Sequence, residues 1–203
     1  MSFVKLSDNK TRAFYGETLP NPKLNVLPIE EIASLGKELG IPLIVDNTAA
    51  PITCKPIEHG AAIVIHSLTK WIGGHGTSIG GIIVDGGNFD WTKIPERHPN
   101  FNQPEPSYWN WVLSKVVPKV LGANITFAVR LRFVLLRDLG SALSPTNAFN
   151  FIQGLETLPI RFKKHQDNTK KVADYLSGKN NVNRVIHPKY QHGIHKDLSL
   201  IHI

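Results

Sequence analysis

Two short apolar runs enclose a glycine-rich stretch with a single lysine, and this arrangement restricts the possible folds more than any other feature of the chain. Residues 62–65 (Ala-Ile-Val-Ile) and 81–84 (Gly-Ile-Ile-Val) are rich in β-branched side chains and bounded by glycine or polar residues, as buried strands are. Between them lie Ser-Leu-Thr-Lys at 67–70 and five glycines within residues 73–81. The sequence therefore predicts two strands of one sheet joined through a lysine-containing turn.

A strand, a helix and a second strand are predicted before this turn. Residues 11–15 form an extended run. Residues 28–39 carry apolar side chains at helical spacing, with a proline suited to the first turn and Gly40 suited to the end. Residues 41–45 then form a buried strand. A βαβ unit of this length implies a parallel sheet covered by helices, so we expect an α/β fold.

Lys70 is the candidate nucleophile. It follows a buried strand directly, and Trp71 and Ile72 come after it. We expect these two side chains to shield the lysine from water, which would favour the neutral amine that can attack a carbonyl group.

Asp46 is the candidate acid of the same site. It ends the predicted strand at residues 41–45, and ligands of open α/β sheets gather at the carboxyl ends of strands. The alternative is that this carboxylate caps the next turn.

Three further polar residues are candidates for ligand binding. Ser67 and Thr69 are spaced i, i+2, so on an extended segment both hydroxyls would face one way, as phosphate binding requires; ordinary turn capping is the alternative. Asn21 stands between two prolines that hold it on a rigid loop after the first strand. It is either a turn residue or an amide directed at a ligand.

These motifs together resemble a known enzyme family. Val-Asp-Asn-Thr at 45–48 and the run from His66 to Gly81 are similar to the pyridoxal-phosphate-dependent enzymes of cysteine and methionine metabolism, nearest to the O-acetylhomoserine sulfhydrylase branch. The similarity extends from about residue 17 to about residue 188. It implies fold-type I, the aspartate aminotransferase-like fold, with pyridoxal 5′-phosphate as cofactor and no metal. The residues that the resemblance assigns to the cofactor are Lys70 (covalent attachment), Asp46 (ring nitrogen), Ser67 and Thr69 (phosphate) and Asn21 (phenolic oxygen).

The resemblance also implies a reaction. In the whole enzyme, sulfide or a thiol would replace the acetate of O-acetylhomoserine to give homocysteine or methionine, and Lys70 would move protons as general base and acid. Cystathionine γ-synthase and methionine γ-lyase share every residue used here. A catalytically dead fragment is a further alternative.

The resemblance covers only the middle of such an enzyme, so we expect a chain that is incomplete at both ends. Residues 1–160 would form the C-terminal part of the large cofactor-binding domain, and residues 161–203 the connecting helix and the start of the small domain. Residues 197–203 match nothing expected there. The full-length enzyme would be a homodimer or homotetramer.

Composition argues against other classes of protein. The net charge of +7 is spread along the chain, without the aromatic-basic pattern of nucleic-acid binding. There is no run of eighteen apolar residues and no signal-peptide core, which argues against a membrane span and against secretion. The single cysteine, Cys54, fits a reducing compartment, so we expect a cytoplasmic protein. Cys54 itself is interpreted as a small buried hydrophobe rather than a reactive thiol.

The second half of the chain is expected to be mainly helical. Residues 86–108 lack periodicity and predict a long loop. Helices are predicted at 128–139, from an N-cap at Ser144 through residue 155, and at 161–176 beyond Pro159. Residues 180–185 should begin a strand. His75 is interpreted as a loop histidine, and Arg161 as structural rather than as a clamp for the substrate carboxylate.

Overall fold

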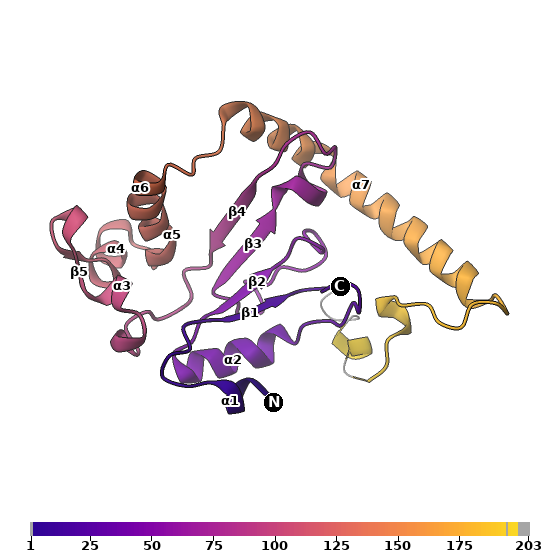
Figure 1. Ribbon diagram of the computed structural model, residues 1–203, viewed down its shortest axis with the longest axis horizontal. Coiled ribbons are helices and arrows are strands. Elements are labelled where there is room, and N and C mark those ends of the chain that lie inside the picture. The colour runs from indigo at the N-terminus through magenta and orange to yellow at the C-terminus, as the bar shows by residue number, and fades with distance from the viewer. Residues whose placement is uncertain (1, 194, 199–203) are drawn as a thin grey trace.

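A four-stranded sheet lies at the centre of the computed structural model, which describes residues 2–193 and 195–198 (Figure 1). Its strands follow chain order: β1 (Phe14–Glu17), β2 (Leu43–Asp46), β3 (Ile63–Ser67) and β4 (Gly81–Asp85). β1, β2 and β3 are mutually parallel, whereas β4 runs antiparallel to β3. The expected mostly parallel α/β sheet is confirmed.

Helix α2 (Ile29–Leu39) connects β1 to β2, so the predicted βαβ unit is confirmed. The helix ends at Gly40, which has a φ of 63° and donates its N–H to the carbonyl of Gly36. A left-handed residue at this position is the usual helix ending, and glycine adopts it without a steric penalty.

Helical layers cover both faces of the sheet. Side chains alternate along each strand, so each face has apolar side chains of its own to bury. One face packs against α2 in a core cluster whose sheet residues are Phe14, Leu43, Val45 and Val64. The other face packs against the segment that follows β4, in a cluster of Ile44, Ala62, Ile63, Phe89, Trp91, Phe101 and Phe127.

The region between β4 and residue 140 is more ordered than the sequence predicted. Instead of a long loop, residues 86–108 contain a 3₁₀ turn (Pro95–Arg97), α3 (Pro99–Asn102), β5 (Pro104–Glu105) and a second 3₁₀ turn (Pro106–Tyr108). The reason is packing: Trp91 and Phe101 enter the core cluster and hold this segment against the sheet.

The helices that follow are largely as expected. β6 (Trp111–Val112) pairs with β5 and leads into α4 (Leu113–Leu121). The helix predicted at 128–139 is confirmed as one continuous rod built from α5 (Thr126–Arg130), a π-helical stretch (Leu131–Leu136) and α6 (Arg137–Leu139), ending at Gly140.

The C-terminal part departs from expectation in two places. Helix α7 runs unbroken from Pro145 to Ser177 with the predicted Ser144 cap, so Pro159 does not end the helix. Residues 180–185 are coil rather than a strand, since no strand of the described chain pairs with them. A short helix, α1 (Ser2–Leu6), precedes the sheet, and a 3₁₀ turn (Pro188–Tyr190) follows α7.

Two predictions about the C-terminus remain open. The predicted domain division at residue 160 lies inside the continuous α7 and stays a prediction. Of the tail at 197–203, residues 199–203 lie outside the described chain. No helix in the part of the chain that the structure describes has the length and apolarity to cross a membrane.

Candidate active site

Lys70 lies on a short π-helical turn, Leu68–Ile72, that begins where β3 ends. Its own backbone, with φ −94° and ψ −118°, departs from helical geometry. Two hydrogen bonds of 2.8 Å close the turn, from the N–H of Gly73 to the carbonyl of Leu68 and from the N–H of Gly74 to that of Lys70. The turn therefore presents the lysine side chain, which is exposed, at the carboxyl end of the sheet.

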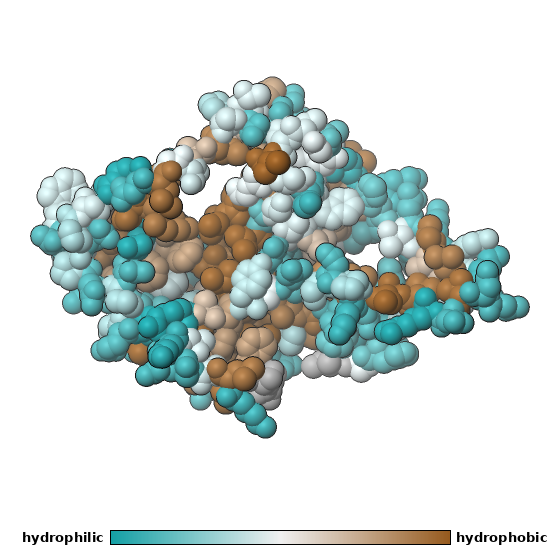
Figure 2. All heavy atoms as spheres, viewed as in Figure 1, coloured by the Kyte–Doolittle hydropathy of each residue, from teal (hydrophilic) through white to brown (hydrophobic). Residues whose placement is uncertain are grey.

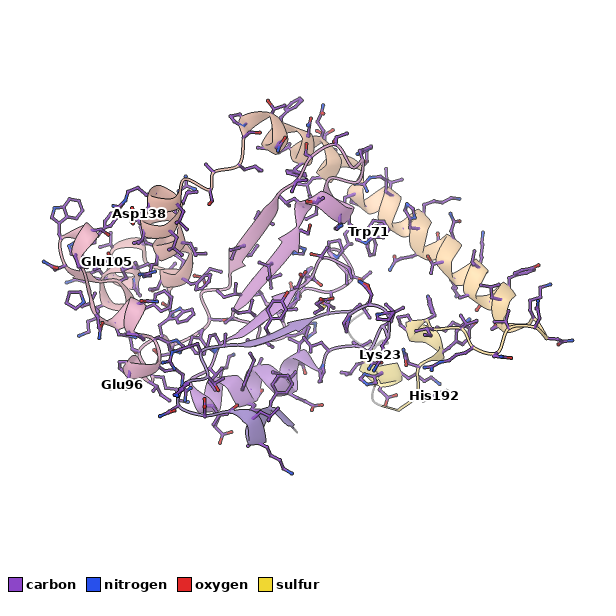
Figure 3. The ribbon with its side chains drawn as sticks, viewed as in Figure 1. Lys23, Trp71, Glu96, Glu105, Asp138 and His192 are labelled. Atoms are coloured by element: carbon purple, nitrogen blue, oxygen red, sulfur yellow. The ribbon has the colours of Figure 1, made fainter. Side chains whose placement is uncertain are left out.

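The expected shielding of Lys70 by its two neighbours is wrong. Lys70 is exposed, whereas Trp71 and Ile72 pack with the first half of α7, in a cluster with Phe151 and Phe162. Figure 3 shows Trp71 beside α7, and its ring meets that of Phe162 edge-on at 4.9 Å. Ile72 is buried and Trp71 partly buried in this cluster, so the two side chains anchor the turn instead of covering the amine.

Asp46 lies at the carboxyl end of β2, as predicted. One carboxylate oxygen, Oδ1, accepts a hydrogen bond of 2.9 Å from the N–H of Thr48. The other, Oδ2, is 3.4 Å from the hydroxyl of Tyr15 on the neighbouring β1. The carboxylate is thus held in place, and within the described residues Oδ2 has only this one long hydrogen-bond contact.

Ser67 shares a face of the sheet with Asp46. Asp46 pairs with Ile65 across β2 and β3, and Ser67 is two residues further along β3. Paired residues and residues two apart project to the same side of a sheet. The structure therefore brings the acid and the serine to one side at the carboxyl ends of adjacent strands.

Thr69 lies differently from Ser67. The chain is already helical at Leu68, so the extended segment assumed for the i, i+2 spacing ends at Ser67. The hydroxyl of Thr69 accepts a bond of 3.1 Å from the N–H of Gly80 and approaches the carbonyl of Gly80 at 3.3 Å. Thr69 thus closes the glycine-rich stretch against the lysine turn.

Asn21 lies on the loop that leaves β1. Its side chain is exposed and the residue sits in a turn. This loop starts beside Asp46, because the N–H of Thr18 donates to the Asp46 carbonyl at 3.0 Å. Its predicted role as a cofactor ligand stays a prediction.

Arg161 fixes the lysine turn from the side of α7, in agreement with the predicted structural role. Its guanidinium donates to the carbonyls of Trp71 at 3.0 Å, Ile72 at 3.4 Å and Gly154 at 2.8 Å. The carbonyls of Trp71 and Ile72 directly follow Lys70, so the arginine couples the position of the turn to that of α7.

Two residues near Asp46 escaped the analysis of the sequence. Thr48 contacts both Asp46 and Ser67, and its place within Val-Asp-Asn-Thr was the signal that could have revealed it. His66 has a buried Nδ1 without a hydrogen-bond partner in the described chain. Burial lowers the pKa of His66, and the nearby charge of Asp46 acts in the opposite direction. Together with Asn47 and Cys54, His66 lines a pocket of about 290 Å³.

The remaining sequence candidates have structural surroundings. Cys54 is buried, as predicted, and burial raises its thiol pKa to about 11. His75 is exposed and lies 2.7 Å from the carbonyl of Gly73. Within residues 2–193 and 195–198, no group of three His, Cys, Asp or Glu side chains could hold a metal ion.

Lys70 is exposed after β3, and the carboxylate of Asp46 is fixed at the end of β2, the neighbouring parallel strand. This arrangement is expected of an enzyme that carries a pyridine cofactor. The chain belongs to the Cys/Met metabolism PLP-dependent enzyme family, whose sequence profile matches residues 2–200. The resemblance inferred from the motifs is therefore confirmed.

Two relatives show where in this family the chain lies. It is 48% identical over 191 residues to O-acetyl-L-homoserine sulfhydrylase from Leptospira meyeri, an alignment that spans 92% of this chain and 43% of the relative. It is 44% identical over 188 residues to homocysteine/cysteine synthase from Saccharomyces cerevisiae, spanning 92% and 41%. The chain thus spans less than half the length of the curated relatives it matches.

Solved structures confirm the fold-type I architecture. The chain superposes with a TM-score of 0.87 and 34% identity on a protein described as an O-acetylhomoserine (thiol)-lyase from Campylobacter jejuni, covering 99% of this chain and 49% of that one. That crystal structure contains an N′-pyridoxyl-lysine-5′-monophosphate. Cystathionine gamma-lyase from Lactobacillus plantarum, in complex with L-serine, gives a TM-score of 0.71 at 26% identity, covering 98% and 42%.

Proposed function

We propose that this protein takes part in a pyridoxal-phosphate-dependent γ-replacement on O-acetylhomoserine, in which sulfide or a thiol displaces acetate to give homocysteine or methionine. The observation that carries the proposal is the pairing of Lys70 on the turn after β3 with Asp46 at the end of β2. The names of the relatives supply the substrate class.

The residues present fit the cofactor. Asp46 offers a carboxylate oxygen whose contact with the Tyr15 hydroxyl is long, at 3.4 Å, and an anion of this kind keeps a pyridine nitrogen protonated. The Ser67 hydroxyl lies on the same face of the sheet and suits a phosphate oxygen. The amine of Lys70 is exposed and able to react with an aldehyde.

Each side chain has a distinct task in this proposal. When bound, pyridoxal phosphate supplies an electron sink for the substrate carbanion. Lys70 would hold the cofactor and, when free, would remove and return protons at the substrate carbons as general base and acid. Asp46 would keep the ring nitrogen protonated. Ser67 and Thr69 would hold the phosphate, and Asn21 the phenolic oxygen.

Two parts of the proposal, the oligomeric state and the choice among related activities, concern the full-length enzyme. We propose that the full-length enzyme is a homodimer or homotetramer. Cystathionine γ-synthase and methionine γ-lyase remain the alternative activities, because they would use the same lysine and acid. Assays of the full-length enzyme with sulfide, methanethiol and cysteine as acceptors, and with different γ-substituted amino acids, separate these activities by their products.

A labelling experiment tests the assignment of Lys70. The chain is mixed with pyridoxal phosphate, reduced with borohydride and digested, and the modified peptide is identified by mass spectrometry. We expect one label, on Lys70, and its loss in Lys70→Arg, with Lys55→Arg as the control on a nearby exposed lysine. A label that persists on other lysines in Lys70→Arg would falsify the assignment.

The role of Asp46 has its own measurement. Asp46→Asn keeps the shape of the side chain but removes its charge, so we expect the label on Lys70 to remain. In the full-length enzyme the same change should lower kcat/KM on the order of a hundredfold, as for the loss of one preorganised electrostatic contact. An unchanged kcat/KM contradicts the role given to Asp46.

A further inference from the structure

The ends of β2 and β3 are joined through the side chain of Thr48. Past the last residue of β2, the backbone ladder continues once more, from the N–H of Asn47 to the carbonyl of Ile65 at 2.9 Å. At the next step the N–H of Ser67 donates to the Thr48 hydroxyl oxygen at 2.7 Å. The Thr48 hydroxyl therefore accepts the hydrogen bond from β3 that a backbone carbonyl would accept if β2 continued along β3.

Thr48 is also bonded to the acid of the site. Its own N–H donates to Oδ1 of Asp46 at 2.9 Å. One residue thus contacts the carboxylate proposed for the ring nitrogen and the backbone of the serine proposed for the phosphate. In the proposed function, these are the anchors of two different groups of the same small cofactor.

Neighbouring bonds fix where Thr48 itself lies. The buried side chain of Asn47 accepts from the hydroxyl of Thr18 at 2.7 Å and donates to the carbonyl of Cys54 at 2.9 Å. Asn47 is 1% exposed, so this network is shielded from water and holds the turn after β2 rigidly. The Thr48 hydroxyl consequently acts from a fixed point.

We propose that Thr48 is a positioning residue of the pyridoxal phosphate site, setting the distance between Asp46 and the segment that carries Ser67 and Lys70. This inference rests on the proposed function. It assigns to the hydroxyl an effect on phosphate recognition that Thr48 exerts through Ser67.

Three variants separate the hydroxyl from its surroundings. Thr48→Val keeps the shape and removes the acceptor, so the partly buried N–H of Ser67 loses its partner. Thr48→Ser keeps the acceptor. Thr53→Val is the matched control on the same connecting segment, because the Thr53 hydroxyl is buried with no hydrogen-bond partner in the described chain.

The binding experiment compares pyridoxal phosphate with pyridoxal, which lacks the phosphate. Dissociation constants are measured by absorbance for the full 203-residue chain and each variant. We expect Thr48→Val to bind pyridoxal phosphate about tenfold more weakly, the effect of one unmade, partly buried hydrogen bond, while binding of pyridoxal changes little. Thr48→Ser and Thr53→Val should keep the wild-type ratio of the two constants. Equal weakening of both ligands, or none, overturns the inference.

A second measurement needs no cofactor. Amide hydrogen exchange at Ser67, followed by NMR, should become at least about tenfold faster in Thr48→Val, because the N–H is freed, and stay unchanged in Thr53→Val. Unchanged exchange in Thr48→Val contradicts this inference alone. A wild-type chain that binds no pyridoxal phosphate, while exchange at Ser67 responds as expected, contradicts the proposed function instead.

Discussion

His98 is a buried histidine whose charge is determined by its surroundings. It is 5% exposed, its Nε2 lies 2.9 Å from the carbonyl of Gly40, and its ring meets those of Phe89 and Trp91 edge-on. Burial lowers its pKa, the hydrogen bond to the Gly40 carbonyl acts in the opposite direction, and the nearby positive charges of Arg97 and Arg12 lower the pKa further. His98 is therefore neutral in the folded protein at pH 7 and serves as a packed hydrogen-bond donor.

The lowered pKa of His98 predicts a pH dependence of stability. In the unfolded chain the imidazole binds a proton below about pH 6.5, whereas in the folded chain it does so only at a lower pH. Between these values the unfolded state holds more protons, so the free energy of unfolding falls as the pH falls. We expect urea denaturation to give a lower free energy of unfolding at pH 5.5 than at pH 7.5.

His98→Gln tests the origin of this slope, because glutamine retains a donor for the Gly40 carbonyl but does not titrate. The loss of stability between pH 7.5 and 5.5 should be smaller in His98→Gln than in the wild type. Part of it should persist, because burial lowers the pKa of His66 as well. An equally steep slope in the variant would show that His98 does not titrate as inferred.

At the next scale, the contact between α7 and the lysine turn determines the shape of the site. Gly154 of α7 lies directly against the backbone of the turn: a Cβ added there would come within 2.3 Å of the Ile72 carbonyl oxygen and 2.6 Å of that of Gly73. Arg161, two helical turns further on, bonds carbonyls of the same turn. The helix therefore holds the segment that follows Lys70 by backbone contact as well as by side chains.

This close approach predicts the effect of Gly154→Ala. Alanine favours a helix over glycine by about 1 kcal/mol. Both atoms that the new Cβ would meet belong to the backbone, so relief of the overlap must separate α7 from the turn, and overpacking costs about 1–3 kcal/mol. We expect a net loss of stability and weaker labelling of Lys70 by pyridoxal phosphate. Thermal denaturation and the borohydride assay measure the two effects.

Gly178→Ala is the matched control. It stands at the end of the same helix, where an added Cβ comes no nearer than 3.8 Å to another atom and φ is −90°. The substitution should leave the melting temperature unchanged or raise it slightly. If Gly154→Ala behaved like Gly178→Ala, the close contact with the lysine turn would not exist in solution.

The elements differ in how far the sequence predicts them. The βαβ unit and the strands around Lys70 follow from local patterns, because apolar periodicity and glycine boundaries are written in consecutive residues. Pro159 suggested a break in α7 that tertiary contacts override: Phe151, Leu158 and Phe162 pack on both sides of it against the lysine turn. The direction of Trp71 was equally unpredictable, since it depends on a helix that begins more than seventy residues later.

For the molecule as a whole, the apolar surface is not fully covered. Figure 2 shows apolar residues gathered across the middle of the molecule, where Figure 1 draws the strands. β4 pairs with β3 on one side only in the described sheet, and its residues Ile82, Ile83 and Val84 are 44%, 46% and 38% exposed. An unpaired edge strand with apolar residues on both faces is a template for association.

This exposed edge predicts that the 203-residue chain associates with itself as its concentration rises. Lysine on an edge strand opposes such pairing, because its charge would lie beside the apolar side chains of the added strand. Ile83→Lys should therefore reduce the association, seen as a lower average mass in sedimentation or light scattering at equal concentration.

Ile79→Lys is the matched control, since Ile79 is 80% exposed but lies outside β4. A similar drop in both variants would point to net charge, which both raise from +7 to +8, while a drop in Ile83→Lys alone would locate the association at the edge of the sheet.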